Sequence, residues 1–281
     1  MAKAKTEPLY RLVVFEAVDD PAAVRDLFCK VTGLHPTDAT QWVARAPGVW
    51  PRPLTAGQAR ELLDGLYVLG VAAEARLAET FPELAPARTI HDAACLAEGF
   101  RVKGLRGEPT HWVPWDKVEL IAAGRIEAED EYRGVNPPKW PSAAAAAIRA
   151  LTLRNPHPFE RRSRAMRVPR DPVGEVIIVR KDPLLAIRVV ENKMNYAYLG
   201  DRLSTSAAAN FPLFVADLVA RADDATITPS TRALLGHGDP AEALFATPQA
   251  LLDYATHRLL WRQYVHDRDQ AHGESPGTDE T

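Results

Sequence analysis

The residues with the clearest capacity for chemistry are arginines gathered in one segment of the chain. Guanidinium groups bind phosphates and carboxylates through paired N–H donors. Six arginines fall within seventeen positions, namely Arg154, Arg161, Arg162, Arg164, Arg167 and Arg170. The segment 136–171 is therefore a candidate arginine-rich insertion that binds an anion, and the last five of these arginines are its candidate ligands. A solvated loop is the alternative interpretation of the same residues.

Histidine and cysteine spacing favours structural roles over metal binding. None of the eight histidines forms an H-x-x-x-H pair with an intervening glutamate. His91, Asp92, Cys95 and His111 could converge on a zinc ion, but no pair of ligands has the short spacing typical of zinc sites. We therefore interpret these histidines as capping or surface residues and expect no metal ion.

Common motifs of catalysis and nucleotide binding are absent from the sequence. It contains no G-x-G-x-x-G after a strand, no G-x-x-x-x-G-K-[ST] and no G-x-S-x-G. The acidic run 127–131 lacks the spacing of an acid/base pair and is typical of a solvated edge. We expect a non-enzymatic protein that needs no cofactor.

Composition and charge are those of an ordinary globular protein. The chain has 281 residues, of which 46% are hydrophobic and 25% charged, and its net charge is −3. This balance gives no overall attraction to nucleic acid or to anionic membranes. Cys29 and Cys95 lie in apolar stretches and predict reduced thiols. No apolar run approaches the ~20 residues that cross a bilayer, so we expect a cytoplasmic protein without membrane insertion.

The first 80 residues predict a small α+β module. Strands are expected over 10–18 and 71–77, and helices over 21–33, 37–46 and 55–70. Asp20 before Pro21 is a typical helix start, and Gly33 is a typical stop. The order strand, helix, helix, helix, strand predicts three helices packed on a sheet.

This segment resembles the C-terminal domain of the bacterial ribosomal stalk protein over residues 10–77. The family pattern T-G-L-x-L-K-E-A-K-x-L-V-E-x-A-P matches at Thr32, Gly33, Leu34, Ala39, Val43, Ala46 and Pro47. Its third helix, S-K-x-x-A-E-x-L-K-x-x-L-E-x-A-G, matches at Thr55, Ala59, Leu62, Leu66 and Gly70. The resemblance implies the stalk fold for this quarter of the chain.

The factor-binding role of that family is not implied. The stalk domain recruits translation factors with basic and apolar residues on its first two helices. At the aligned positions this chain carries Pro21, Ala22, Arg25, Asp26, Cys29 and Thr40. We therefore expect a protein partner of a different kind, bound on the exposed side of these helices around Arg25, Asp26, Lys30 and Gln41.

A similar helix–sheet arrangement occurs in the adaptor that delivers N-degron substrates to the Clp protease. Asp19 and Asp20 are similar to its acidic pair, which accepts the free α-amine of a peptide. The adaptor's histidine on the second helix is replaced here by Ala46. Helix capping is the alternative role of the two aspartates.

The second half of the sequence predicts a different set of elements, dominated by strands. Pro-rich residues 81–88 predict a linker, and 89–266 a β-rich domain with helices at its C-terminal end. Strands are expected over 97–103, 111–115, 175–180, 184–190 and 194–198, and 116–124 predicts a strand or a short turn that leads into one. Helices are expected from Ser204 to Val219 and from Pro248 to Tyr264, and 267–281 predicts a disordered tail. The stretch V-P-W-D-K-V-E-L-I-A-A-G with the later strands and helix resembles a bacterial pleckstrin-homology-like (PH-like) domain.

Two functional hypotheses follow. The first is a non-enzymatic adaptor that binds a protein partner through residues 1–80. The second is an anion- or nucleic-acid-binding protein that uses Arg161 to Arg170, for which retention of nucleic acid should collapse at higher salt.

Overall fold

The protein has an α+β fold, seen in a computed structural model that describes residues 7–103, 110–127, 131–133, 166–168 and 171–273. Two compact units are present: residues 1–126 with 173–281, and residues 127–172. The second unit contains a short antiparallel pair, β9 (Glu131–Arg133) and β10 (Met166–Val168). All other elements described below belong to the first unit.

Residues 7–77, here called the N-terminal region, form a three-stranded antiparallel sheet covered by three helices. The elements in chain order are β1 (Tyr10–Val14), α1 (Pro21–Thr32), α2 (Pro36–Val43), β2 (Gly48–Val49), α3 (Ala56–Val68) and β3 (Ala73–Leu77). The strand order is β2-β1-β3, and Tyr10 pairs with Leu77. The short β2, which the sequence did not predict, pairs with Val13 and Val14.

Local side-chain chemistry sets the helix ends in this region. The Asp20 carboxylate accepts hydrogen bonds from the Ala22 and Ala23 amides, which confirms its capping role. Gly33 ends α1 with a φ of 72°, a left-handed conformation that glycine adopts without steric cost. Thr55 and Gln58 form a reciprocal capping box at the start of α3. Helix α2 was expected to reach residue 46 but ends at Val43, and His35 caps it.

The larger sheet has the order β13-β8-β11-β12-β4, with β14 also paired to β8. Its strands are β4 (Arg88–Ile90), β8 (Val118–Ile126), β11 (Val173–Arg180), β12 (Leu185–Val190), β13 (Thr226–Ile227) and β14 (Leu244–Phe245). A second antiparallel sheet joins β5 (Ala93–Leu96), β6 (Gly99–Val102) and β7 (His111–Pro114).

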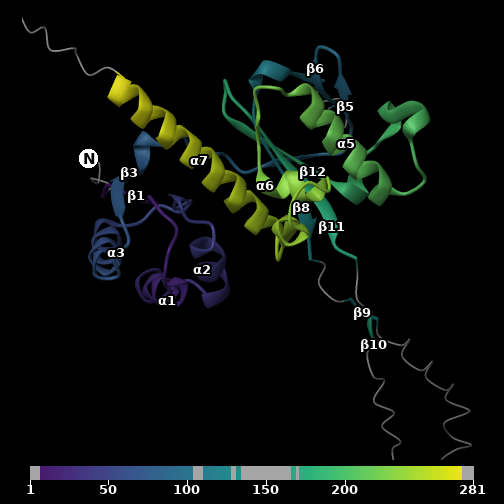
Figure 1. Ribbon diagram of the computed structural model, residues 1–281. Coiled ribbons are helices and arrows are strands. Elements are labelled where there is room, and N and C mark those ends of the chain that lie inside the picture. Colours follow the sequence, from purple (N-terminus) through teal and green to yellow (C-terminus); the bar gives the residue numbers. More distant parts are fainter. Residues whose placement is uncertain (1–6, 104–109, 128–130, 134–165, 169–170, 274–281) are drawn as a thin grey trace, which may run out of the picture. The chain divides into compact units, whose positions relative to one another are not determined.

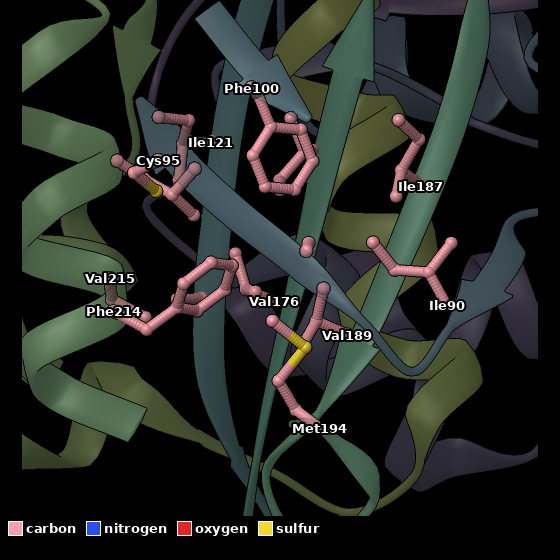
Figure 2. Packing of buried hydrophobic residues seen from close by; sticks show 14 of the residues in the cluster. Ile90, Cys95, Phe100, Ile121, Val176, Ile187, Val189, Met194, Phe214 and Val215 are labelled. Carbon is pink, nitrogen blue, oxygen red and sulfur yellow. The ribbon is translucent and has the colours of Figure 1, made fainter. Parts of the chain in front are cut away.

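Both faces of the larger sheet are buried, because apolar residues occupy consecutive positions of its central strands. Val176 and Ile178 of β11 belong to one cluster, and Ile177 and Val179 belong to the other. The first cluster is closed by α5 (Ala207–Arg221) and the smaller sheet. Figure 2 shows Phe214 of α5 and Phe100 of β6 in this cluster beside residues of the central strands.

The other face is covered by α7 (Pro248–Gly273), which also packs on the N-terminal region. Leu251, Ala255 and Leu259 join the cluster of β8 and β11. Leu260 and Tyr264 join a separate cluster with Val13 and Val49. In Figure 1, α7 is the long yellow helix, and it contacts β2 of the N-terminal sheet and β8 of the larger sheet. This one helix therefore links two regions that are far apart in sequence.

Several sequence expectations need correction in the second half. Residues 194–198 do not form a strand: an isolated bridge at Asn195 is followed by the 3-10 helix η4 (Ala197–Arg202). Helix α5 begins at Ala207 rather than at Ser204, whose backbone instead exchanges two hydrogen bonds with the Asn210 side chain. Residues 267–273, expected to be disordered, continue α7. The linker predicted over residues 81–88 stays a prediction; Phe81 of this segment is buried with Leu260 and Tyr264.

Two short helices, α6 (Pro229–Leu234) and η5 (Pro240–Ala243), connect β13 to β14. The turn expected at residues 236–240 lies between them, and its Gly236 has a φ of 86°. Pro229 and Glu242 of this connection lie close enough to α7 to line a pocket with it.

Candidate binding cleft between α2 and α7

A buried histidine joins α7 to the N-terminal region. His257 is 1% exposed, and its Nδ1 lies 3.0 Å from the carbonyl oxygen of Val49 in β2. Burial lowers the pKa of His257 from 6.5 to about 4, so the imidazole is neutral near pH 7. A neutral ring that donates from Nδ1 satisfies the Val49 carbonyl. Gly48 allows this approach, because a Cβ built there would lie 1.8 Å from His257 Cε1.

Two pockets adjoin this contact, and they share Gln41 and Arg45 of the α2 end. One has a volume of about 270 Å³ and is lined by α2, the segment after β2, and the start of α7. The other has a volume of about 390 Å³ and is lined by α2, the α6–β14 connection, and the middle of α7. We call the two together the α2–α7 cleft.

The smaller pocket combines aromatic walls with charged groups. Trp42 and Trp50 pack edge-to-face, with ring centroids 4.3 Å apart. Arg52 and Asp253, which also line this pocket, form an ion pair at 3.3 Å. The Nε1 groups of both tryptophans and Nε2 of His257 are buried, and none of them has a hydrogen-bond partner in the part of the chain that the structure describes. Buried polar atoms without a hydrogen-bond partner are costly unless water or a ligand satisfies them.

The larger pocket holds two guanidinium groups against one aromatic ring. Arg45 lies 4.8 Å from the centroid of Tyr254, and Arg258 lies 5.4 Å from the same centroid. Arg45 also lies 5.4 Å from the Phe245 ring. Burial lowers the pKa of Arg45, and the nearby charge of Arg258 acts in the same direction, partly offset by Tyr254 and Asp253. Among the described residues, both arginines therefore contact aromatic rings, and neither forms an ion pair with a carboxylate.

The sequence-predicted partner residues fall into two groups. Gln41 lines both pockets of the cleft. Arg25, Asp26 and Lys30 line neither pocket: Arg25 and Asp26 pair with each other at 2.6 Å, and Lys30 pairs with Glu61 at 3.5 Å. Only Gln41 is therefore brought next to other candidate binding residues.

The anion-binding candidates of the insertion lie outside the described residues, with one exception. Arg161, Arg162, Arg164 and Arg170 are not described, and Arg167 is the central residue of β10. The structure therefore places no described side chain of this group at a site.

Apart from Gln41, the residues of the larger pocket were not identified from the sequence as binding residues. Tyr254, His257, Arg258 and Trp261 recur on α7 at i, i+3, i+4 and i+7, the spacing of one helix face. An aromatic and basic stripe of this kind was a readable signal for a binding face. Arg45 gave no such signal, because it follows α2 in a short loop.

A second cluster around α5 is fully paired within the chain. The Asp217 carboxylate accepts hydrogen bonds from Arg202 at 2.9 and 2.6 Å and from the Tyr198 hydroxyl at 3.0 Å. The hydrogen bonds from Arg202 lower the pKa of Asp217. Cys95 lies nearby, and burial raises its pKa to about 12, so it is an unreactive thiol at neutral pH.

The residues considered for zinc in the sequence include His91, which has a hydrogen-bond partner within the fold. His91 Nδ1 lies 3.1 Å from the carbonyl oxygen of Lys193, an arrangement typical of a structural histidine. Over residues 7–103, 110–127 and 171–270, no group of three His, Cys, Asp or Glu side chains is arranged to hold a metal ion.

None of the helices in the described part of the chain has the length and apolar character needed to cross a bilayer. Comparison of the chain with protein-family models, curated proteins and solved structures found no match.

Proposed function

We propose that this chain is a cytoplasmic, non-enzymatic adaptor that binds a protein partner in the α2–α7 cleft. In this proposal the N-terminal region is a stalk-like interaction module, and the PH-like second half serves as its scaffold. The observation that carries the proposal is that Gln41 and Arg45 line two adjoining pockets, which α7 completes from the other end of the sequence.

The chemistry of the cleft suits a protein segment. Its walls combine proline and aromatic side chains, including Trp50, Pro51 and Trp261, with polar and charged side chains, including Gln41 and Arg45. Tryptophan, tyrosine and arginine are the residue types that dominate binding energy at protein interfaces.

The cleft is held in shape by the core of the protein. His257 is fixed by Val49, and α7 is anchored on both sides by buried leucines. A preformed cleft reduces the entropy lost when a partner segment binds.

Photo-crosslinking from Gln41 tests this function. A photoreactive amino acid replaces Gln41 in the full chain, and a matched protein carries it at Arg60, an exposed residue of α3 outside the cleft. We expect a discrete protein adduct from position 41 that is absent from position 60. The captured protein is then purified, and its affinity for the wild-type chain is measured.

The proposal fails if both positions give the same adducts, or if the purified protein does not bind. Recovery of nucleic acid instead of protein, in a form that dissociates at higher salt, would favour the arginine-rich insertion as the functional site.

A further inference from the structure

The larger pocket of the cleft holds two guanidinium groups, those of Arg45 and Arg258, that form no ion pair with any described residue. Neither Arg45 nor Arg258 forms an ion pair or a side-chain hydrogen bond with any residue that the structure describes. The Nε of Arg258 is buried and has no hydrogen-bond partner among these residues. Both guanidinium groups nevertheless lie over one ring, that of Tyr254.

This arrangement is unfavourable in the absence of a ligand. Partly buried cations lose hydration, and two like charges near one another repel. Stacking on Tyr254 and Phe245 offsets part of this cost through the ring faces. Stacking does not use the N–H donors at the edges of the guanidinium planes, which form hydrogen bonds with oxyanions.

The geometry points to a carboxylate of the partner as the group that binds between Arg45 and Arg258, an inference that rests on the proposed function of the cleft. The carboxylate is supplied by an acidic side chain or by a chain terminus of the bound segment. It accepts N–H hydrogen bonds from the two guanidinium groups and neutralises their repulsion.

A carboxylate fits the pocket better than a phosphate does. Glu242 lines the same pocket and Asp253 acts on Arg45, so the positive charge of the two arginines is already partly offset. A single negative charge matches this balance, whereas a phosphate that carries two charges would leave an excess. Pro47, Leu244 and Trp261 line the remaining wall and suit an apolar neighbour of the carboxylate.

The test uses N-acetyl-leucine as a probe, which joins a carboxylate to an apolar side chain. N-acetyl-leucinamide is the neutral control, and inorganic phosphate is the third ligand, all at constant ionic strength. Binding is followed in the full chain by NMR of the arginine Nε–H and tryptophan Nε1–H resonances. We expect N-acetyl-leucine to shift the resonances of Arg45, Arg258 and Trp261, and to bind more tightly than either other ligand.

Substitution assigns the binding to these arginines. Arg45→Gln with Arg258→Gln should weaken binding of N-acetyl-leucine by about tenfold or more, because hydrogen bonds between charged groups are lost. The matched control is Arg60→Gln on α3, which should bind as the wild type does. Arg45→Lys alone keeps the charge but loses the planar fork, and should give an intermediate affinity if the double variant does not fold.

Equal binding of the acid and the amide would overturn the inference, as would tighter binding of phosphate or an undiminished affinity in the arginine variants. The same experiments distinguish failure of the carboxylate inference from failure of the proposed adaptor function. A partner that crosslinks from Gln41 and binds the double variant unchanged refutes only the carboxylate. If N-acetyl-leucine binds as expected but no protein is crosslinked from position 41, only the adaptor function is refuted.

Discussion

The α2–α7 cleft and the cluster on α5 both contain arginine and tyrosine side chains, but the arginines are paired differently in the two places. On α5, Arg202 binds Asp217 through two hydrogen bonds, and Tyr198 donates a third. In the cleft, Arg45 and Arg258 lie on Tyr254 without a carboxylate from any described residue. The first cluster is complete within the chain, whereas the second has donors left for another molecule.

This contrast indicates which part of the protein has polar groups available for a ligand. A paired charge contributes to the stability of the fold, and an unpaired one contributes less or opposes it. Sites that bind ligands often retain such unfavourable groups, because removing them would remove function. The polar groups of the α5 cluster are satisfied within the described residues, as expected of a structural cluster, whereas some of those of the cleft are not, as expected of a binding site.

Acid should destabilise the cleft before it affects the α5 cluster. The pKa of His257 is about 4 in the folded protein against 6.5 without burial, so the unfolded chain binds the proton first as the pH falls. The stability that depends on neutral His257 is complete above pH 6.5 and is lost between pH 6.5 and about 4, a difference of about 3 kcal/mol. Urea unfolding measured across this pH range tests the prediction.

The matched variant is His257→Gln, which should have a lower stability at pH 7.5 and a flatter pH dependence. The pKa of Asp217 is lowered below 3.8 by its hydrogen bonds with Arg202, so its contribution is complete above pH 3.8 and is lost only below it. An identical loss of stability between pH 6.5 and 4 in wild type and His257→Gln would contradict the assignment.

Gly48→Ala should disturb the cleft through the same histidine. The added Cβ would lie 1.8 Å from His257 Cε1, so either β2 or α7 must shift. Overpacking of this kind destabilises a protein by about 2 kcal/mol. Gly57→Ala is the control, since a Cβ at Gly57 in α3 has no atom within 4 Å and should be neutral or slightly stabilising. Denaturant midpoints that are equal for the two variants would show that the Gly48 contact is unimportant.

Asp217→Asn should weaken the α5 cluster. The amide cannot accept from Arg202 as a carboxylate does, and the Tyr198 hydrogen bond loses its charge assistance. We expect a loss of about 1 kcal/mol in the free energy of unfolding at pH 7, because Asp217 is only 15% exposed. Asp26→Asn, which breaks an exposed pair with Arg25, should have little effect. A loss no greater than that of Asp26→Asn would mean that the α5 cluster is not structural.

Arg45→Gln should have the smallest effect on stability. The variant loses its cation–π contacts but also removes a desolvated charge that repels Arg258, and these changes nearly cancel. We expect a change below about 1 kcal/mol by urea denaturation, together with a clear loss of the affinity of the cleft for its partner. A destabilisation larger than that of Asp217→Asn would remove the contrast between the two regions.

Much of the N-terminal region could be predicted from sequence, because its determinants are local. Asp20, Gly33 and Thr55 fix helix ends through neighbouring backbone groups, and each was identified correctly. The second helix was predicted over 37–46 but spans Pro36–Val43, with His35 as its N-cap, and the sequence showed neither end correctly. The stalk-like and PH-like assignments remain proposals.

The candidate site was predicted only at Gln41. The other three partner residues pair with each other or with Glu61, a result that helix periodicity alone does not reveal. Arg45 and Arg258 are 213 positions apart, and their meeting depends on where α7 packs. Long-range contacts of this kind have no local signature in a single sequence.

The α+β class, the strand and helix alternation of residues 10–77, and the capped starts of α1 and α3 could be read from the sequence. These features depend on side chains that act on backbone groups a few residues away. The packing of α7 on the N-terminal region and on the larger sheet, and the contact of His257 with Val49 across 208 positions, are visible only in the folded structure. Such contacts depend on complementary shapes, so the α2–α7 cleft exists only once the chain has folded.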